Sequence, residues 1–368
     1  MAPAATAIAT TTSPIPQTQT PSPASPVPIV DFGPFLSASA TPTSRRSVAT
    51  DIDAAFRSVG FVYLTNHGIP QQEIDACFAW SKRFFALPPA TKALAPHPPT
   101  GAHHRGYSAP ATEKVTQHTY TSSDITSART VPDVKESFDS GNPADERQPN
   151  IWAPEDVLPG FRAAQERFFA LCAQLVHRVL EALGTALALP DERDLSNAHA
   201  ASAFQLRLLH YPPVAVRALR EGVKARIGAH SDFGSLTVLF QESGGEEEVG
   251  GLEGEDGEGE RRWRPAPPVP GAVLVNIGDL MERWSNGRWR STMHRPWEGA
   301  RSEVDGPETD GVDGEELCAP RYSIPFFAAP DDDAVIDALP GCWGEERPKK
   351  FEAVTAREYV TMRMNALY

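Results

Sequence analysis

Two histidines and one aspartate in this sequence are placed so that they could hold a metal ion together. His230 and Asp232 lie two residues apart in the stretch RIGAHSDFGSLTVLFQ, immediately before an apolar run. In an extended strand, residues i and i+2 face the same side, so this imidazole and this carboxylate are expected to project together. His294, in the stretch STMHRP, is available as a third ligand. We predict that the three side chains converge on one cation.

The ligand types indicate which cation this would be. Two imidazoles and one carboxylate form the facial triad of non-haem Fe(II) oxygenases, which leaves three coordination positions open for substrate and dioxygen. The imidazoles favour iron over calcium, and no fourth side-chain ligand is evident for a structural zinc site. The HxD pair alone is weak evidence, because this spacing often arises by chance and such a histidine is commonly a surface residue.

A second group of polar residues could bind an organic anion. Arg321 and Ser323, in the stretch RYS, share one face of a predicted strand, and Arg207, Leu209 and Tyr211 share one face of another. A guanidinium, a hydroxyl and a phenol are the groups needed to hold a remote carboxylate by bidentate hydrogen bonds. The ordinary alternative for Arg321 is a surface ion pair.

The elements that must position these residues begin with a mainly helical part. Helical or strand periodicity predicts three helices, over residues 44–60, 72–88 and 158–187, and two strands, within 27–36 and 61–70. The residues between 89 and 150 are rich in Pro, Ser, Thr and Gly and show weak periodicity. We expect a long irregular segment there, of the kind that is often functional.

Beyond residue 200 the pattern changes to short strands separated by turns. The predicted strands are FQLRLLHYPP, SLTVLFQ, GAVLVNIGDL, GRWRSTMHRP and RYSIPFFAAP. In the fourth of them, Arg288, Arg290, Thr292 and His294 would share one face. Helices followed by many short strands indicate an α+β chain whose second half is an antiparallel sandwich or barrel.

Composition and charge exclude several classes of function. The 368 residues carry a formal charge of -14, but nine acids lie in 242–260 and seven in 301–317, so the rest of the chain is close to neutral. We expect these two Gly-rich insertions to be solvated loops. No basic patch is available to neutralise phosphates, so nucleic acid binding is disfavoured, and no apolar window is long enough for a membrane helix.

The chain termini and cysteines predict a cytoplasmic protein. Residues 1–26 are rich in Thr, Pro, Ser and Ala and lack the basic and apolar regions of an export signal, so we expect a disordered leader. The four cysteines show no CxxC spacing, which favours reduced thiols over a zinc site or a disulfide framework. They are Cys77, Cys172, Cys318 and Cys342.

Eight motifs in order resemble one known family. They are VPIVDF, GFVYLTNHGIP, KRFFALP, KESFDSG, LRLLHYPP, HSDFGSLTVLFQ, VLVNIGDLMERWSNGRWRSTMHRP and RYSIPFF. From about residue 28 to 365 the chain is similar to the Fe(II)/2-oxoglutarate-dependent dioxygenases of the isopenicillin N synthase type. The resemblance implies an α+β fold with a mainly β core, a double-stranded β-helix (jelly roll) with flanking N-terminal helices. It divides the chain into an N-terminal dioxygenase region, 27–150, and a long helix plus catalytic core, 151–368.

The resemblance also implies roles for particular residues. His230, Asp232 and His294 would bind iron, whereas Arg321, Ser323 and Tyr211 would bind the distal carboxylate of 2-oxoglutarate, with ascorbate as a candidate activator. Asn276 and the NIGD stretch match a scaffold turn. One departure is Leu209, where plant members have an asparagine near the C1 end of 2-oxoglutarate. Arg207 either compensates for that loss or meets an acidic substrate.

The implied activity is oxidation of a small, partly hydrophobic natural product by hydroxylation, desaturation or ring rearrangement. Succinate and CO2 would be released, and dioxygen and the small molecule would be the partners of a monomer or weak homo-oligomer. Candidate substrate residues are Phe327, Phe138, Phe204, Tyr107 and Arg207, although aromatic residues most often simply pack in a core. Two alternatives stay open, namely an Fe(II) oxidase that needs no 2-oxoglutarate and a non-catalytic binding protein on the same scaffold.

Overall fold

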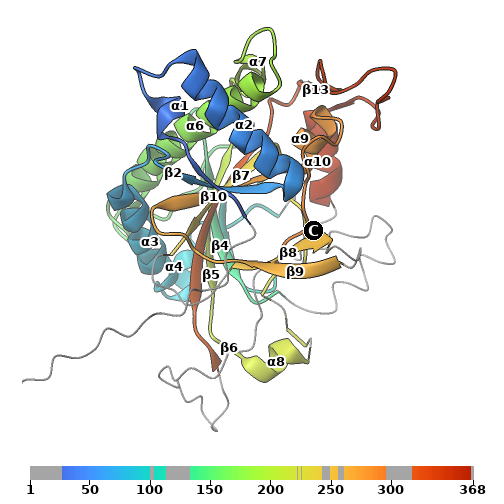
Figure 1. Cartoon of the computed structure of the whole chain (residues 1–368). Coiled ribbons are helices and arrows are strands. Elements are labelled where there is room, and N and C mark those ends of the chain that lie inside the picture. Colours follow the sequence, from blue (N-terminus) through green and yellow to red (C-terminus); the bar gives the residue numbers. More distant parts are fainter. Residues whose placement is uncertain are drawn as a thin grey trace, which may run out of the picture.

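One large sheet forms the centre of the computed structural model, which describes residues 27–99, 103–112, 133–221, 223–224, 226–242, 249–255, 261–295 and 317–365. Its strands are β1 (Ile29–Asp31), β2 (Phe61–Thr65), β3 (Gly106–Ser108), β4 (Glu136–Gly141), β5 (Gln205–Tyr211), β7 (Leu236–Gln241), β10 (Ala272–Ile277) and β12 (Arg321–Ala328). The eight strands lie in the order β1-β2-β10-β7-β12-β5-β4-β3 (Figure 1). β1 and β2 are parallel, and the other neighbouring strands are antiparallel.

Helices cover one face of this sheet. The described helices are α1 (Gly33–Leu36), α2 (Pro42–Ser58), α3 (Gln71–Phe85), α4 (Pro89–Lys92), α6 (Phe161–Ala186), α7 (Asp194–Asn197), α8 (Val216–Arg220), α9 (Asp279–Trp284) and α10 (Ala356–Asn365). The longest, α6, packs Phe168 against Phe240 of β7 and Phe169 against Phe326 of β12, with ring centroids 5.1 and 5.2 Å apart. Because strand residues alternate between faces, the neighbours of Phe326 in β12 point away from the helices.

The three predicted long helices are confirmed as α2, α3 and α6. Their apolar stripes account for this, because Phe161, Phe168, Leu175, Val179 and Leu183 of α6 are all buried. Burial of each such side chain contributes roughly 1.5–3 kcal/mol. The Asn-His-Gly turn after β2 is also confirmed, with positive φ at Asn66 and Gly68.

The segment from 89 to 150 is more regular than predicted, since it contributes β3 and β4 to the large sheet. β4 reads ESFDSG and carries polar side chains, yet all six of its residues are buried. Glu136 is held by Lys92 Nζ at 2.6 Å, by His210 Nδ1 at 2.7 Å and by the Tyr107 hydroxyl at 2.6 Å. Ion pairs and hydrogen bonds therefore stabilise this strand, which is why it lacks an apolar periodicity.

The predicted strand in GRWRSTMHRP is wrong, because 288–293 is an extended loop that runs along the end of α2. Arg288 forms a bidentate ion pair with Asp53 of α2, with N–O distances of 2.8 and 2.9 Å. The Arg290 amide donates to Phe56 O, and the Thr292 hydroxyl donates to Val59 O. The alternation in this stretch therefore reflects contacts with a helix terminus, and only His294 itself pairs with another strand-like residue, His230.

Short antiparallel pairs complete the described structure. They are β6 (Val214–Ala215) with β11 (Leu317–Cys318), β8 (Val249–Glu255) with β9 (Arg261–Ala266), and β13 (Val335–Ile336) with β14 (Val354–Thr355). The first acidic insertion therefore contains a strand, contrary to the prediction of a loop throughout. The leader 1–26 and nearly all of the second insertion lie outside the described residues. Within the described chain, no helix is long and apolar enough to span a bilayer.

A buried histidine beneath the sheet predicts a pH-dependent stability. Burial lowers the pKa of His199 to about 4, and its ring contacts Leu195 O at 2.6 Å and the Ser235 hydroxyl at 2.8 Å. Between pH 6.5 and 4, His199 is protonated in the unfolded chain but not in the native protein. The free energy of unfolding therefore decreases as the pH is lowered, by about 2 kcal/mol from pH 7 to pH 5. Urea unfolding of the wild type and His199→Gln at both pH values measures this loss. Equal pH dependence in the two proteins would contradict it.

Candidate metal centre and active-site cavity

The structure brings His230, Asp232 and His294 together. The Nε2 atoms of His230 and His294 each lie 3.9 Å from Asp232 Oδ1, and the three ligand atoms lie within 4.8 Å of one another. Reciprocal backbone hydrogen bonds of 2.9 and 2.8 Å join the two histidines. His230 precedes β7 and His294 follows β10, so this pair brings together two segments that are far apart in the chain. This spacing is that of ligands around one cation.

Hydrogen bonds orient both imidazoles for metal binding. Nδ1 of His230 lies 2.9 Å from Gly228 O, and Nδ1 of His294 lies 3.1 Å from Thr292 O. A carbonyl only accepts, so each Nδ1 carries the proton and each Nε2 presents a lone pair toward Asp232. Burial, followed by the repulsion that would arise if the His294 ring were also protonated, lowers the pKa of His230 to about 4, which keeps its ring neutral and able to bind a metal.

The carboxylate ligand is held by two side chains on its other oxygen. Asp232 Oδ2 accepts hydrogen bonds from Thr237 Oγ1 at 2.5 Å and Asn276 Nδ2 at 2.7 Å, so Oδ1 is turned toward the histidines. Burial opposes ionisation of Asp232, but the two histidines and these two donors outweigh it and lower the pKa of the carboxyl. The donor set thus fits a divalent cation with a 2-His-1-carboxylate preference.

The NIGD turn supports the ligand loop as well as ending β10. The amides of Gly278 and Asp279 donate to Ser235 O and Asp232 O at 2.9 and 2.7 Å. A Cβ at Gly278 would overlap Gly234 O, so the close approach of the two loops requires glycine there. Asn276, assigned to the scaffold from the sequence, therefore also positions the Asp232 carboxylate. Its signal is an amide inside the apolar run VLVNI, which needs a buried hydrogen-bond partner.

The triad lies in a cavity of about 440 Å³ on the sheet face opposite α6. Residues of four strands line it, mostly at alternate positions: Gln205, Arg207, Leu209 and Tyr211 of β5, Leu236, Thr237 and Leu239 of β7, Leu274 and Asn276 of β10, and Arg321, Ser323, Pro325, Phe327 and Ala328 of β12. Because consecutive inward residues are about 7 Å apart, the floor runs from Arg321 at one end to Phe327 roughly 20 Å away.

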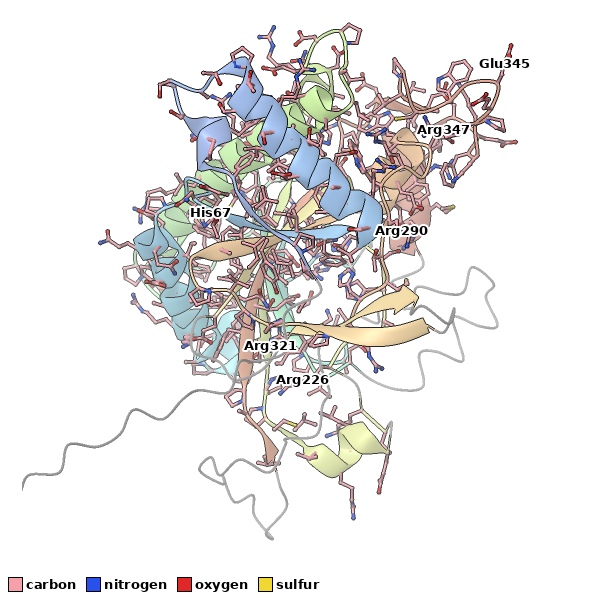
Figure 2. All side chains as sticks on the ribbon, in the orientation of Figure 1. His67, Arg226, Arg290, Arg321, Glu345 and Arg347 are labelled. Atoms are coloured by element: carbon pink, nitrogen blue, oxygen red, sulfur yellow. The ribbon has the colours of Figure 1, made fainter. Side chains whose placement is uncertain are left out.

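Arg321, Ser323 and Tyr211 lie together at one end of the cavity. In the register of β12 and β5, Arg321 pairs with Tyr211 and Ser323 pairs with Leu209. The Arg321 guanidinium carbon is 5.9 Å from the Tyr211 ring centroid, and Figure 2 shows Arg321 above Arg226 at this end. Burial raises the pKa of Tyr211 despite these two cations, so its hydroxyl stays protonated and can donate. An apolar side chain, Leu209, stands where plant members have an amide.

The predicted substrate residues divide into two groups. Phe327 and Arg207 line the cavity, so the structure places both beside the triad. Phe138 and Tyr107 instead pack against Phe84 in the helix-side core, with ring centroids 4.7 and 5.9 Å from it, and Phe204 packs on Phe326. These three aromatics line no part of the cavity, because they pack on the helix side of the sheet. The structure therefore does not support their prediction as substrate residues.

The C-terminal helix is tied to the ligand loop, a contact that the sequence did not reveal. Arg363 of α10 is 5% exposed and forms an ion pair with Asp279, whose amide already braces Asp232. The same guanidinium lies 3.5 Å from the hydroxyl of Ser231, between the two HxD ligands, and 5.8 Å from the Phe233 ring centroid. α10 also lines the cavity through Ala356, Arg357 and Val360.

We expect Arg363→Ala to lower the free energy of unfolding by roughly 2 kcal/mol, because it leaves the partly buried Asp279 carboxylate without its cation. Fe(II) binding should weaken several-fold, since the ligand loop loses its brace. Urea unfolding and anaerobic Fe(II) titration measure the two effects. Arg347→Ala is the control, because the described contact of the Arg347 side chain is a hydrogen bond to Gly341 O at the surface. Unchanged iron affinity in Arg363→Ala would show that the brace is dispensable.

Comparison with known proteins identifies relatives over nearly the whole chain. Residues 27–157 match the family described as "non-haem dioxygenase in morphine synthesis N-terminal", and residues 202–330 match the 2OG-Fe(II) oxygenase superfamily. The chain is 38% identical to the 2-oxoglutarate-dependent dioxygenase htyE of Aspergillus rugulosus, over 92% of this chain and 98% of that protein. It is 37% identical to the proline hydroxylase buaE of Petromyces alliaceus, over 92% and 98% of the two chains.

Solved structures show the same fold. A full-length Neurospora crassa protein in complex with alpha-KG superposes with a TM-score of 0.75 at 34% identity, covering 92% of this chain and 95% of that one. A putative 2OG-Fe(II) oxygenase family protein of Caulobacter crescentus gives a TM-score of 0.70 at 30% identity, covering 93% and 99%. The expected jelly-roll fold is therefore confirmed. Fold, triad and relatives together establish that the chain belongs to the 2OG-Fe(II) oxygenase superfamily and is an Fe(II)- and 2-oxoglutarate-dependent dioxygenase.

Proposed function

We propose that His230, Asp232 and His294 are the iron ligands of this dioxygenase. The observation that carries the proposal is the convergence of two proton-free Nε2 atoms and one carboxylate oxygen within 4.8 Å inside the cavity. When bound, the iron and 2-oxoglutarate supply dioxygen activation coupled to release of succinate and CO2, which drives oxidation of a substrate C–H bond. The residues hold the cation on one side and leave the other side to the cavity.

The distal carboxylate of 2-oxoglutarate is assigned to Arg321, Ser323 and Tyr211. A guanidinium fork suits a carboxylate in two parallel hydrogen bonds, and the two hydroxyls add donors from neighbouring positions of β12 and β5. Binding at this end fixes the orientation of the keto acid relative to the triad, so its other end is presented to the metal. Leu209, Leu239 and Leu274 contribute apolar side chains to the lining of the same cavity.

The remaining space is assigned to a small, partly hydrophobic natural product. We expect Phe327→Ala to raise the KM for this substrate by about tenfold and to change product regiochemistry, because the ring forms the floor at the end opposite Arg321. Once a substrate is found, product analysis and KM measure both effects. Phe204→Leu, which alters a core ring outside the cavity, is the control. The same KM and products in wild type and Phe327→Ala would remove Phe327 from the substrate site.

An oxygen-free titration tests the proposed residues directly. The apoprotein is titrated with Fe(II) and then with 2-oxoglutarate, and the weak visible charge-transfer band of the chelate is recorded. Appearance of the band, followed by succinate release in air, supports the proposal. Iron binding without a band would favour an oxidase that takes its electrons from the substrate alone. Failure to bind iron would remove the triad assignment.

Cellular setting and assembly form a separate part of the proposal. The enzyme is assigned to the cytoplasm, as a monomer or weak homo-oligomer that acts on small molecules and not on nucleic acid or membranes. All four cysteines are free thiols, which suits a reducing compartment. Cell fractionation and light scattering of the purified protein test these assignments. Secretion into the medium or a tight oligomer at micromolar concentration would contradict them.

A further inference from the structure

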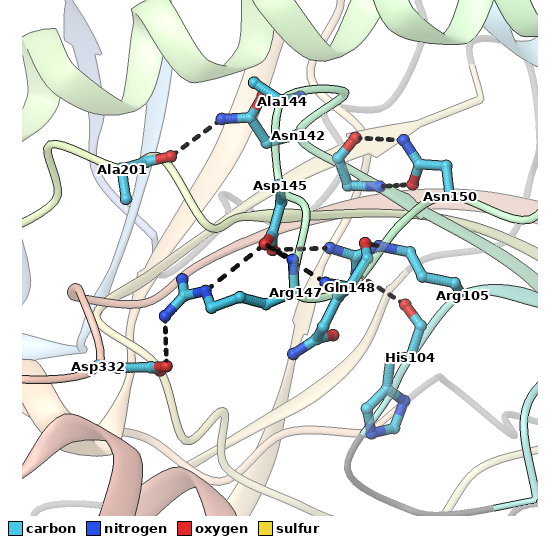
Figure 3. A network of polar contacts seen from close by, with 11 residues as sticks. His104, Arg105, Asn142, Ala144, Asp145, Arg147, Gln148, Asn150, Ala201 and Asp332 are labelled. Carbon is cyan, nitrogen blue, oxygen red and sulfur yellow. Dashed lines mark hydrogen bonds and ion pairs between the residues drawn. The ribbon is translucent and has the colours of Figure 1, made fainter.

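Four arginines that line the cavity each pair with an aspartate, and we call Arg105, Arg147, Arg207 and Arg357 the arginine wall. Figure 3 shows part of this network. Arg147 Nη1 and Arg357 Nη2 both lie 2.7 Å from the same oxygen of Asp332, Oδ2. Two guanidinium groups on one carboxylate oxygen repel each other, so a second anion beside them would be stabilised.

The inner members of the wall are fixed by buried contacts. Arg207 forms a bidentate pair with Asp139, with N–O distances of 2.7 and 2.9 Å. Arg105 is 3% exposed and donates to His104 O at 2.7 Å and Gln148 O at 3.2 Å. A side chain at Gly141 would overlap its guanidinium, so the glycine makes room for Arg105. Arg105 and Arg207 are therefore held in place, whereas the side chains of Arg147 and Arg357 are 53% and 64% exposed and are positioned by Asp332.

The wall carries a net positive charge that the cofactors do not neutralise. Among the described contacts, its four guanidinium groups pair with three carboxylates, those of Asp139, Asp145 and Asp332. Among the described residues that line the cavity there are six arginines and three aspartates, with no lysine or glutamate. Fe(II) and 2-oxoglutarate have equal and opposite formal charges, so loading the site leaves this excess in place. An anionic group on the substrate would offset it.

The position of the wall separates it from the proposed 2-oxoglutarate site. Along β5, Tyr211 lies at the Arg321 end, whereas Arg207 and Gln205 lie toward the other end, where Gln205 pairs with Phe327. Thr237, which holds the Asp232 ligand, pairs with Phe327 from the other side. The residue that supports Asp232 is therefore level with Phe327, at the end of the cavity away from Arg321.

Resting on the function proposed above, we infer that the substrate is a small, largely apolar carboxylate. Its carboxylate binds Arg147 and Arg357 at the arginine wall. Its apolar part lies over Phe327 and Val360, which places its C–H bonds toward the metal ligands. Arginine is suited to this role because its planar fork binds a carboxylate through two hydrogen bonds.

Anaerobic calorimetry with the Fe(II)- and 2-oxoglutarate-loaded protein tests the inference without turnover. The probes are apolar L-amino acids, including L-proline, together with their carboxamides and 3-phenylpropanoate. We expect at least one acid to bind and its carboxamide, which lacks the anionic group, to bind at least about tenfold more weakly. Arg147→Gln and Arg357→Gln should each weaken acid binding about tenfold and leave 2-oxoglutarate affinity unchanged. The control is Arg178→Gln, because the side chains of Arg178 and Arg147 are both 53% exposed in ion pairs, and Arg178 lies on α6 outside the cavity.

The outcomes separate this inference from the function on which it rests. If the wild-type protein does not bind iron or does not bind 2-oxoglutarate, the proposed function itself is overturned. If both bind normally, the carboxylate assignment is overturned by amides that bind as well as acids, by the absence of binding for every acid, or by Gln variants that weaken acids and amides equally. Binding of 3-phenylpropanoate as tightly as the amino acids would support the carboxylate contact and show that no ammonium group is needed.

Discussion

His294→Ala is expected to abolish Fe(II) binding at micromolar metal and to reduce 2-oxoglutarate turnover by about a thousandfold or more. His294 supplies one of only two imidazoles in the triad, and its Nδ1 contact with Thr292 O already aims Nε2 at the shared point. The remaining His230 and Asp232 would form a two-ligand site with much lower affinity. Anaerobic Fe(II) titration and succinate release measure the two effects.

The control for this prediction is a histidine outside the cavity. His177 of α6 contacts the hydroxyls of Ser196 and Ser202, both at 2.8 Å, and lines no part of the site. His177→Gln should therefore keep wild-type iron affinity even if stability falls slightly. Wild-type iron binding in a folded His294→Ala protein would mean that the metal is held elsewhere. We expect the variant to fold, because the hydrogen bonds between His294 and His230 are made by backbone atoms. Circular dichroism checks this.

Arg321→Ala should raise the Kd for 2-oxoglutarate roughly 100-fold, because a bidentate charged contact of about 1.5–3 kcal/mol is lost. Arg321→Lys should recover part of the affinity, since lysine restores the charge but not the planar fork. At saturating 2-oxoglutarate, kcat should fall much less than kcat/KM, because the contact acts mainly on binding. Titration of the chelate band gives the Kd, and succinate release gives the kinetic constants.

Arg290→Ala is the control for Arg321→Ala, because it removes an arginine that does not line the cavity. Arg290 is exposed on the loop beside α2, and its described contact is made by its backbone amide. This variant should bind 2-oxoglutarate like the wild type. A small change in the Kd for 2-oxoglutarate in Arg321→Ala, with iron binding intact, would place the distal carboxylate against other residues. Arg226 would then be the next residue to substitute, because it too lies near Tyr211.

The spacing of apolar residues predicted the helices and strands that bury one face of an element in the core. The stripe of α6 and the alternation of β5, β7 and β12 appear directly in the residue types, because one face of each is buried in the core. Motif order predicted the fold, which is confirmed, and it pointed to the three proposed metal ligands, which the structure brings together. β4 escaped detection because its buried carboxylates are stabilised by residues from 92 to 210, a set of contacts with no local periodicity.

Substrate residues were the weakest predictions for a related reason. Phe138, Phe204 and Tyr107 have the same chemistry as Phe327, but the side of the sheet on which each lies depends on register and strand order. A shift of one residue would exchange the cavity face for the helix face. Residue type alone therefore cannot separate a pocket aromatic from a core aromatic.

The sequence by itself supplied the candidate ligands of the proposed metal centre, since the residue types and the HxD spacing are those of a 2-His-1-carboxylate triad. Only the tertiary structure decided what surrounds them. The partners of Asp232, the brace through Arg363 and the arginine wall join residues separated by 5 to 185 positions in the chain. Such contacts arise when the sheet and the C-terminal helix pack together. The strength of an ion pair or hydrogen bond depends on the distance between the two groups in space and not on their separation along the chain, so the sequence alone does not reveal them.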